Sequence, residues 1–300
     1  MTQLPKYLSI FSPSTTSQRK ENFDTYWNFT REHSGELLEQ EQNLSKKQAR
    51  LDSFQSQPVQ LRQPFQNPDA FYRNYVQLQD DAKTLDRKTL LLTCIYKFAR
   101  HEWVGITGAW AATPDMANSR HITDKISRYH LAEEFSHIRL FHEMFRTFRL
   151  DQVEWVPLSF TMRKVYELFP KLPENLMSPF AFVTELMGII FYRRVDALLD
   201  EVFADEPEAA ARLRELLNEI TIDELAHIGQ RRNYLGPVGL KLSQWMTPAL
   251  FRMFFHDIPE TALLFDLELM IQEAQAFDYS EIPASLMRKT WIPSYCIAPA

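Results

Sequence analysis

The sequence contains little glycine, with only 7 residues in 300. Sheet-rich folds and nucleotide-binding loops both depend on glycine at tight turns and at close backbone approaches. Neither G-x-G-x-x-G nor G-x-x-x-x-G-K-[ST] occurs anywhere in the chain. The scarcity of glycine therefore argues against a β-rich or nucleotide-loop architecture.

Cysteine is scarcer still, since Cys94 and Cys296 are the only two. They lie far apart and form no C-x-x-C, so neither a disulfide framework nor a zinc ribbon is indicated. The N-terminus lacks the apolar core of a signal peptide, and no run approaches the roughly 18 apolar residues of a membrane span. We expect a cytoplasmic protein with no membrane span.

Excess positive charge is also missing, because the formal net charge is −6. That balance gives no support for a nucleic-acid partner. Hydrophobic residues make up 45% of the chain and aromatic residues 13%, which is enough for a substantial core. Three hundred residues are long enough for two average domains or one large helical domain.

The order of polar and apolar segments favours one helical domain with an N-terminal extension. Residues 1–68 are polar, and we expect them to pack on the outside of a helical domain that covers residues 69–300. Within the extension, residues 18–50 predict one or two amphipathic helices, followed by a linker. In the domain, four long helices are predicted at 85–112, 119–150, 180–203 and 208–235, and shorter ones at 162–168, 243–255 and 259–277. Gly236-Pro237 is expected to end the fourth long helix.

Two of the long helices carry the same four-residue pattern, Glu-x-x-His. Glu134 and His137 form one copy, and Glu224 and His227 form the other. A spacing of three places both side chains on one face of a helix, one turn apart. A carboxylate and an imidazole presented together suit a first-row divalent metal ion. One copy recurs by chance, but two copies indicate a metal site.

Each of the other two long helices carries a lone glutamate in an apolar stretch, Glu102 in the first and Glu185 in the third. The midpoint between each lone glutamate and its Glu-x-x-His glutamate falls at residue 118 in one case and at residues 204–205 in the other. Both midpoints lie at predicted turns. Residues equidistant from the turn of an antiparallel hairpin sit at the same height, so the pairs should meet.

The complete set resembles the ferritin-like di-iron carboxylate superfamily, in which a four-helix core supplies two lone glutamates and two Glu-x-x-His pairs. The resemblance covers residues 85–235 and implies an all-α, ferritin-like four-helix bundle with additional flanking helices. It implies that Glu134 and Glu224 bridge two metal ions. The six implied ligands are Glu102, Glu134, His137, Glu185, Glu224 and His227. The alternative is that these are ordinary surface or ion-paired helix residues.

The sequence also suggests roles for four residues near the six implied ligands. In this superfamily the acidic residue before the Glu-x-x-His glutamate commonly hydrogen-bonds the histidine of the other pair, which assigns that role to Glu133 and Asp223. His130 lies four residues before Glu134 and is either a further metal ligand or hydrogen-bond donor, or an ordinary, partly buried histidine; the ordinary histidine is favoured. Tyr192 lies on the face toward the metals, but a packed core tyrosine is favoured.

Comparison with members of the superfamily mainly argues against particular reactions. Phe141 stands where the ribonucleotide reductase subunits carry their radical tyrosine. Gly188 and Ile189 stand where multicomponent monooxygenases and acyl-carrier-protein desaturases carry a threonine. The size and layout resemble the p-aminobenzoate N-oxygenase group most, although Ile220 replaces the additional histidine of that group.

We therefore expect an O2-dependent di-iron oxidoreductase that hydroxylates, N-oxygenates or desaturates a small organic substrate. The cofactors would be two Fe ions, or a manganese or mixed pair, with O2. Electrons would come from an external reductase or ferredoxin, and Gly105 and Gly188 would leave room beside the metal glutamates. A ferroxidase or metal-handling protein and a helical protein with a relic site are the alternatives. A homodimer is left open.

Overall fold

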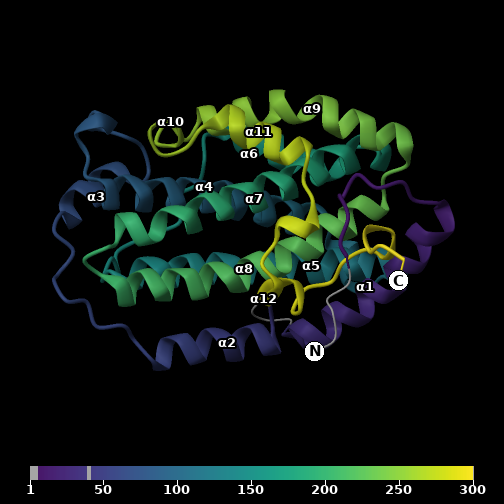
Figure 1. Cartoon of the computed structure of the whole chain (residues 1–300), viewed down its shortest axis with the longest axis horizontal. Helices are drawn as coiled ribbons and strands as arrows, with labels where there is room; N and C mark the ends of the chain where they lie inside the picture. Colours follow the sequence, from purple (N-terminus) through teal and green to yellow (C-terminus); the bar gives the residue numbers. More distant parts are fainter. Residues whose placement is uncertain (1–5, 39–41, 300) are drawn as a thin grey trace.

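The computed structural model describes residues 6–38 and 42–299, and this part of the chain is predominantly helical (Figure 1). Twelve α-helices lie in the described residues. The only sheet among them is a short antiparallel pair, in which β1 (Leu37–Leu38) pairs with β2 (Asn43–Leu44). The predicted all-α class is confirmed.

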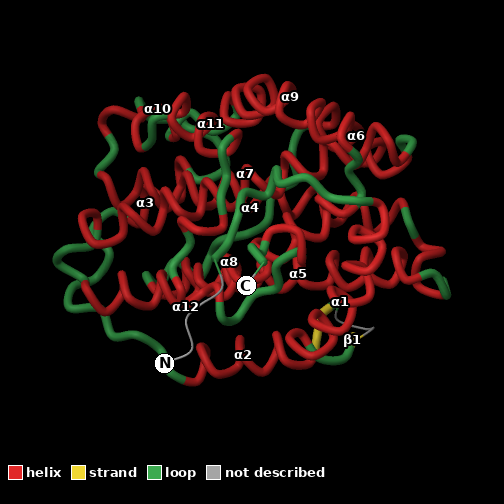
Figure 2. Tube along the Cα trace, turned by 45° about the vertical axis from the view of Figure 1, so that its right-hand side comes forward, coloured by secondary structure: helices red, strands yellow, loops and turns green. Residues whose placement is uncertain are grey.

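Four long helices make up the interior: α4 (Arg87–Ala112), α5 (Ile122–Thr147), α7 (Glu174–Val202) and α8 (Pro207–Asn233). They pack in a closed circuit, with α4 against α5, α5 against α8, α8 against α7 and α7 against α4 (Figures 1 and 2). Most of their inward-facing side chains belong to one hydrophobic core. Each of these helices carries one of the predicted ligand motifs, so the packing brings the motifs to a common interior.

Local sequence signals explain where most of these helices begin. The Asp86 side chain accepts a hydrogen bond from the backbone N–H of Thr89 and so caps α4. Pro207 occupies the first position of α8, where its missing N–H has no intrahelical partner to lose. The turn between α4 and α5 contains the 3₁₀-helix η3 (Pro114–Asn118), at the predicted midpoint of that hairpin.

Helix α7 begins earlier than predicted. The expected start was residue 180, because Pro179 reads as a helix breaker, but α7 begins at residue 174 and contains Pro179. A proline inside a helix removes one backbone donor and crowds the preceding turn. This proline lies near the helix start, where few intrahelical bonds precede it, so the helix continues through it.

Two predictions about the C-terminal third are wrong. Gly236 is not a left-handed cap that ends α8; its φ is −76°, and it is the N-cap of α9 (Pro237–His256). The single helix predicted over 259–277 is two helices, α10 (Thr261–Leu264) and α11 (Leu267–Gln275). Asp266 separates them, because its side chain accepts a hydrogen bond from the backbone N–H of Leu269 and starts a new helix.

The N-terminal segment packs on two of the four long helices, α5 and α8. Helix α1 (Thr16–Ser34) lies against α5 and α8, and α2 (Ser45–Ser56) lies against α5. The buried guanidinium of Arg232 in α8 donates to the backbone carbonyls of Ile10 and Ser12 at 3.1 and 3.0 Å. The segment before α1 is thereby attached to the core.

Shorter elements complete the described chain. The remaining α-helices are α3 (Pro68–Asn74), α6 (Phe160–Leu168) and α12 (Ala284–Met287). The remaining 3₁₀-helices are η2 (Ala82–Thr84), η4 (Phe169–Lys171), η5 (Tyr279–Glu281) and η6 (Ser294–Cys296). Helices α6, α9, α10 and α11 lie along one side of the molecule, the upper side in Figures 1 and 2.

One described helix is long and apolar enough to cross a membrane by length and composition. It is the stretch Leu176–Val202 of α7, and 72% of its most apolar window is buried inside the protein. The same helix packs against α8 and α9 and carries Glu185 toward the interior. Its apolar composition is therefore accounted for by its central place in the core.

Gly229 of α8 permits the closest approach of the C-terminal segment. A Cβ atom at this position would lie 2.8 Å from Cδ of Pro293 and 3.0 Å from the ring of Trp291. Inside a helix, alanine is more favourable than glycine by about 1 kcal/mol. The clash of its Cβ with a rigid proline ring, however, costs about 1–3 kcal/mol.

We predict that Gly229→Ala lowers the free energy of unfolding by about 1–2 kcal/mol, measured by urea denaturation. Gly108→Ala is the matched control, because Gly108 also lies inside a long helix and a Cβ there would make only ordinary contacts, at 3.5 Å or more. Equal stability of the two variants would contradict the predicted clash.

Candidate metal centre

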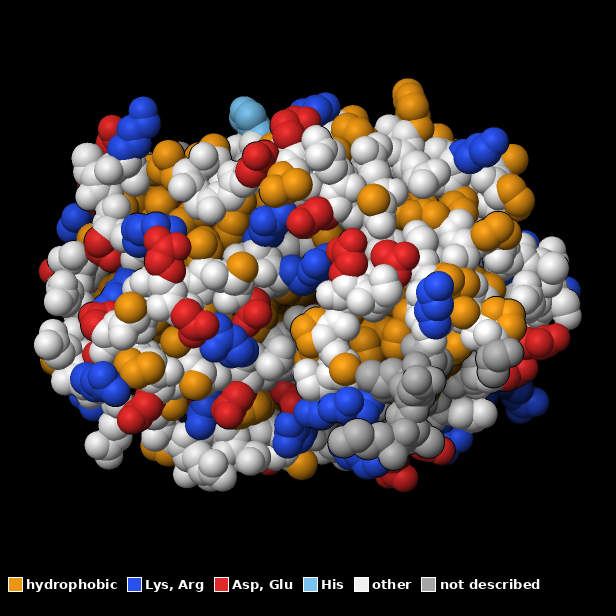
Figure 3. All heavy atoms as spheres, in the orientation of Figure 1, with side chains coloured by type: hydrophobic (Ala, Val, Ile, Leu, Met, Phe, Trp, Pro, Cys, Tyr) orange, Lys and Arg blue, Asp and Glu red, His pale blue; other side chains and the backbone are white. Residues whose placement is uncertain are grey.

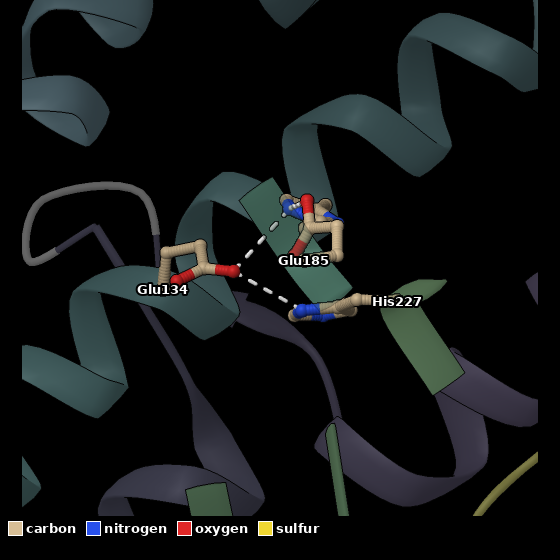
Figure 4. A group of neighbouring side chains, drawn as sticks. Glu134, Glu185 and His227 are labelled. Carbon is tan, nitrogen blue, oxygen red and sulfur yellow. Dashed lines mark ion pairs between the residues drawn. The ribbon is translucent and has the colours of Figure 1, made fainter. Parts of the chain in front are cut away.

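Two groups of buried side chains in the four-helix interior have the composition and spacing to hold metal ions. One contains His130, Glu134, Glu185 and His227, and the other contains Glu134, His137 and Glu224. Within each group the potential ligand atoms lie within 4.8 Å of one another. Figure 4 shows the carboxylate of Glu134 pointing toward Glu185 and His227, which come from other helices.

Glu134 belongs to both groups, and its two oxygens face different partners. Oε1 lies 3.1 Å from Nδ1 of His227 and 3.3 Å from Nε2 of His130. Oε2 lies 3.3 Å from Nδ1 of His137. The same Nδ1 atom of His137 lies 3.2 Å from Oε1 of Glu224. One carboxylate therefore connects two adjacent sites.

Each histidine of the Glu-x-x-His pairs is oriented by the acidic residue of the other pair. Nε2 of His227 lies 2.8 Å from Oε2 of Glu133, and Nε2 of His137 lies 3.0 Å from Oδ2 of Asp223. A carboxylate only accepts, so each Nε2 donates, and this leaves Nδ1 directed at the centre. The crossed hydrogen bonds implied by the superfamily resemblance are confirmed.

The Nδ1 atoms of His130, His137 and His227 are buried and have no hydrogen-bond partner. A buried polar atom without a partner costs free energy unless something else satisfies it. A divalent ion in each group, coordinated by carboxylate oxygens and an imidazole nitrogen, would satisfy the Nδ1 atom of His227 in one group and that of His137 in the other. The side chains therefore fit a metal centre.

The carboxyl groups of the centre differ in pKa, since two of the values are raised and another is lowered. Burial and the neighbouring Glu134 raise the pKa of Glu224 to about 8, and the same two causes raise that of Glu102 well above its usual value. Burial also acts to raise the pKa of Glu185, but the charge and hydrogen bond of His130 together with the charge of Arg231 outweigh it and lower the pKa to about 2. So many carboxylates in one buried space need positive charge, which divalent cations supply.

Glu102 is the one predicted ligand that belongs to neither group. Its Oε1 accepts a short hydrogen bond from the hydroxyl of Tyr192, and its Oε2 is buried without a partner. Tyr192 is the packed core tyrosine that was favoured, since it is buried in the hydrophobic core, and its hydroxyl also contacts a predicted ligand. The sequence signal was present, since Tyr192 lies seven residues after Glu185 on the same face.

His130 belongs to one of the two groups of potential metal ligands, which the favoured interpretation of the sequence did not predict. Its side chain is buried, and Nε2 lies 3.2 Å from Oε1 of Glu185 as well as close to Glu134. The imidazole ring packs on that of His227, with 3.8 Å between the ring centroids. The expectation of a partly buried, ordinary histidine is wrong, and His130 joins the candidate centre.

The N-terminal helices hold the two orienting carboxylates in place. Thr30 and Ser34 of α1 both donate hydroxyl hydrogen bonds to Oε1 of Glu133, the former at 2.5 Å. Lys47 of α2 donates to Oδ1 of Asp223 at 2.6 Å and is itself buried. His33 lies 3.2 Å from the same oxygen. Nothing in the sequence linked residues 1–68 to the site, because this contact forms only after the chain folds back.

Arg231 is a further residue of the site that the sequence did not lead us to predict. Its Nε donates to Oε1 of Glu185 at 3.2 Å. It lies four residues after His227, one helical turn away on the same face, so helix geometry alone would have found it. Its charge counters the excess of carboxylates around the centre.

A cavity of about 190 Å³ reaches the centre from the side of α6 and α9. Its floor includes Glu102, Glu134, Glu185 and Glu224, and Gly105 and Gly188 lie in its wall. Most of the remaining wall is apolar, with Tyr166 and Phe169 from the segment over α4 and Phe254 from α9. Residues of α6, η4 and α9 therefore form part of the cavity wall.

No family model, curated protein or solved structure matches the chain. The interpretation of the site consequently rests on the arrangement of its own residues. That arrangement contains buried histidine and glutamate groups that can hold metal ions, two orienting carboxylates and an adjoining cavity.

We predict that Lys47→Met lowers the free energy of unfolding by about 3–5 kcal/mol, because it leaves the buried carboxylate of Asp223 without its cation. Lys46→Met is the matched control, since Lys46 is exposed and donates only to a backbone carbonyl of α1. Urea denaturation of both variants measures the difference. A loss below about 1 kcal/mol for Lys47→Met would show that the pair is not a determinant of stability.

Proposed function

We propose that this protein is a ferritin-like dimetal oxidoreductase that uses O2 to oxidise a small organic substrate. The observation that carries the proposal is the position of Glu134, whose two oxygens face two adjoining groups of buried ligands. A carboxylate shared in this way suits a pair of metal ions held side by side. The closed packing of α4, α5, α7 and α8 supports the ferritin-like bundle.

The proposed ligands divide between two ions. His227 and Glu185, with His130 beside them, would hold one ion, and His137 and Glu224 would hold the other. Glu134 would serve both. Glu102 completes the set if its carboxylate exchanges the Tyr192 hydroxyl for a metal, and its unpartnered Oε2 is available for that contact.

Iron is the metal we favour, with manganese or a mixed pair as the alternative, because imidazole and carboxylate ligands suit both. Two divalent ions would neutralise four carboxylates. When bound, the metals would supply the redox chemistry with O2, and the protein would supply orientation and a dry pocket. Glu133 and Asp223 would hold the histidine tautomers throughout, through the hydrogen bonds described above.

The cavity favours an organic substrate over a purely ferroxidase role. Its volume of about 190 Å³ and largely apolar wall provide space for a small organic molecule against the carboxylates. A Cβ atom at Gly188 would lie 3.5 Å from Oε2 of Glu224, so the glycine leaves this side of the centre uncovered. Electrons would come from an external reductase or ferredoxin, since the chain has no flavin or iron–sulfur motif.

The first test is the metal content per chain after anaerobic reconstitution with Fe(II). We expect about two iron atoms per chain in the wild type, and half or fewer in Glu134→Gln, because the shared ligand is weakened at both sites. Glu143→Gln is the matched control: Glu143 is buried in the same helix but belongs to neither group. Absence of stoichiometric metal from wild-type protein would refute the proposal.

A second experiment separates the oxidase from the ferroxidase. Ala109 lines the cavity, and Ala109→Phe would fill part of it without touching a proposed ligand. We expect this variant to keep its iron and its O2 consumption with Fe(II) but to lose turnover of any organic substrate found by screening. If filling the cavity leaves every O2-dependent reaction unchanged, the ferroxidase alternative is favoured.

A further inference from the structure

The exposed apolar side chains of the protein are concentrated on one side. Eleven large apolar side chains are exposed among the described residues, and nine of them lie on α6, the start of α7, α9, α10 or α11; a tenth, Leu172, lies between η4 and α7. These elements line the upper side of the molecule in Figures 1 and 2. Figure 3 shows hydrophobic side chains along the same upper edge, interspersed with charged side chains of both signs.

The densest part of this side is formed by the outer faces of α6 and α9. We define the α6–α9 surface by six exposed side chains, Phe160, Val165, Leu168, Val238, Trp245 and Met253. Trp245 is 76% exposed and Phe160 is 67% exposed, so neither is covered by any described part of the chain. Exposed apolar side chains of this size, gathered on two helices of the same side (Figure 2), indicate an interaction surface.

The same two segments form the wall of the cavity. Tyr166 and Phe169 face the cavity from α6 and η4, and Phe254 faces it from α9. His101 joins them inside, with its ring centroid 6.2 Å from that of Tyr166 and 4.8 Å from that of Phe254. Whatever covers the outer faces of these segments therefore lies one helix thickness from the candidate centre.

The charge of the two segments is opposite in sign to that of the whole protein. Helix α6 with η4 carries three basic residues and one acidic residue, and the acidic one, Glu167, is paired with Lys164. Helix α9 carries Lys241 and Arg252 and no acidic residue, although Arg252 is paired with Glu268 of α11. The whole chain has a net charge of −6. A basic, apolar surface on an acidic protein is complementary to an apolar partner with negative charge.

We propose that the α6–α9 surface binds the face of an anionic lipid bilayer. Helices that rest on a bilayer combine exposed tryptophan, phenylalanine and leucine with lysine and arginine, as α6 and α9 do. If the proposed function also holds, the cavity would take an apolar substrate directly from the bilayer. This consequence rests on the proposed function, whereas the binding itself does not require it.

A second copy of the chain is a poorer fit for this surface. A two-fold contact would place the same patch on both partners, so the basic residues of α6 and α9 would face each other. Like charges at a desolvated contact oppose association. Anionic headgroups meet the same residues with opposite charge.

The experiment is co-sedimentation of the metal-loaded protein with vesicles of phosphatidylcholine containing about 30 mol% phosphatidylglycerol. We expect the wild type to sediment with these vesicles, and to do so several-fold less with pure phosphatidylcholine vesicles. The double substitution Phe160→Gln and Trp245→Gln should weaken partitioning by at least about tenfold, because it removes the two largest apolar anchors. Ile297→Gln is the matched control, since Ile297 is exposed but lies outside the surface.

Three outcomes would overturn the proposal. Wild-type protein that remains in the supernatant with phosphatidylglycerol vesicles excludes bilayer binding. Equal partitioning of the wild type and the double variant shows that another surface binds the vesicles. A dimer in gel filtration that the double variant alone abolishes assigns the surface to a second copy. Thermal melting and iron content, measured on every variant, separate these outcomes from misfolding and from failure of the proposed metal function.

Discussion

The structure depends on placing several carboxylates inside a helical core without leaving them unpaired. Glu134, Glu185 and Glu224 are all buried among apolar side chains, where isolated charges are strongly disfavoured. The core accommodates them through histidines on the facing helices and through a geometry that suits bound cations. The pairing of α5 with α8 is what brings the two Glu-x-x-His pairs together.

The need to pair buried charges also applies to the residues around the centre. The histidines that face the carboxylates are themselves held by Glu133 and Asp223, and those acids are held by residues of α1 and α2. The two outer arrangements differ, because Glu133 meets hydroxyls and Asp223 meets the ammonium of Lys47. On the side away from the histidines, Asp223 is therefore balanced by a lysine, whereas Glu133 accepts hydrogen bonds from uncharged hydroxyls. The two halves of the centre are alike in motif but not in electrostatic environment.

The cavity connects the buried carboxylates with the side of the molecule formed by α6 and α9. It leads from the carboxylates to a wall formed by α6, η4 and α9, and α6 and α9 carry six of the eleven exposed large apolar side chains of the described chain. A thin wall of this kind places the proposed binding surface close to the candidate metal centre. That proximity joins the two proposals in space, while each depends on separate residues.

The sequence by itself determined the helical class, the four long helices and the repeated motif, because apolar periodicity and a three-residue spacing are local properties of a helix. It also predicted the crossed hydrogen bonds from Glu133 and Asp223, although through a family resemblance. Only the tertiary structure decided that His130 joins the centre, that Glu102 bonds Tyr192, and that Lys47 reaches Asp223. The last contact spans 176 positions of the chain. Helix periodicity carries no information about such partners, since they are chosen by how the helices pack.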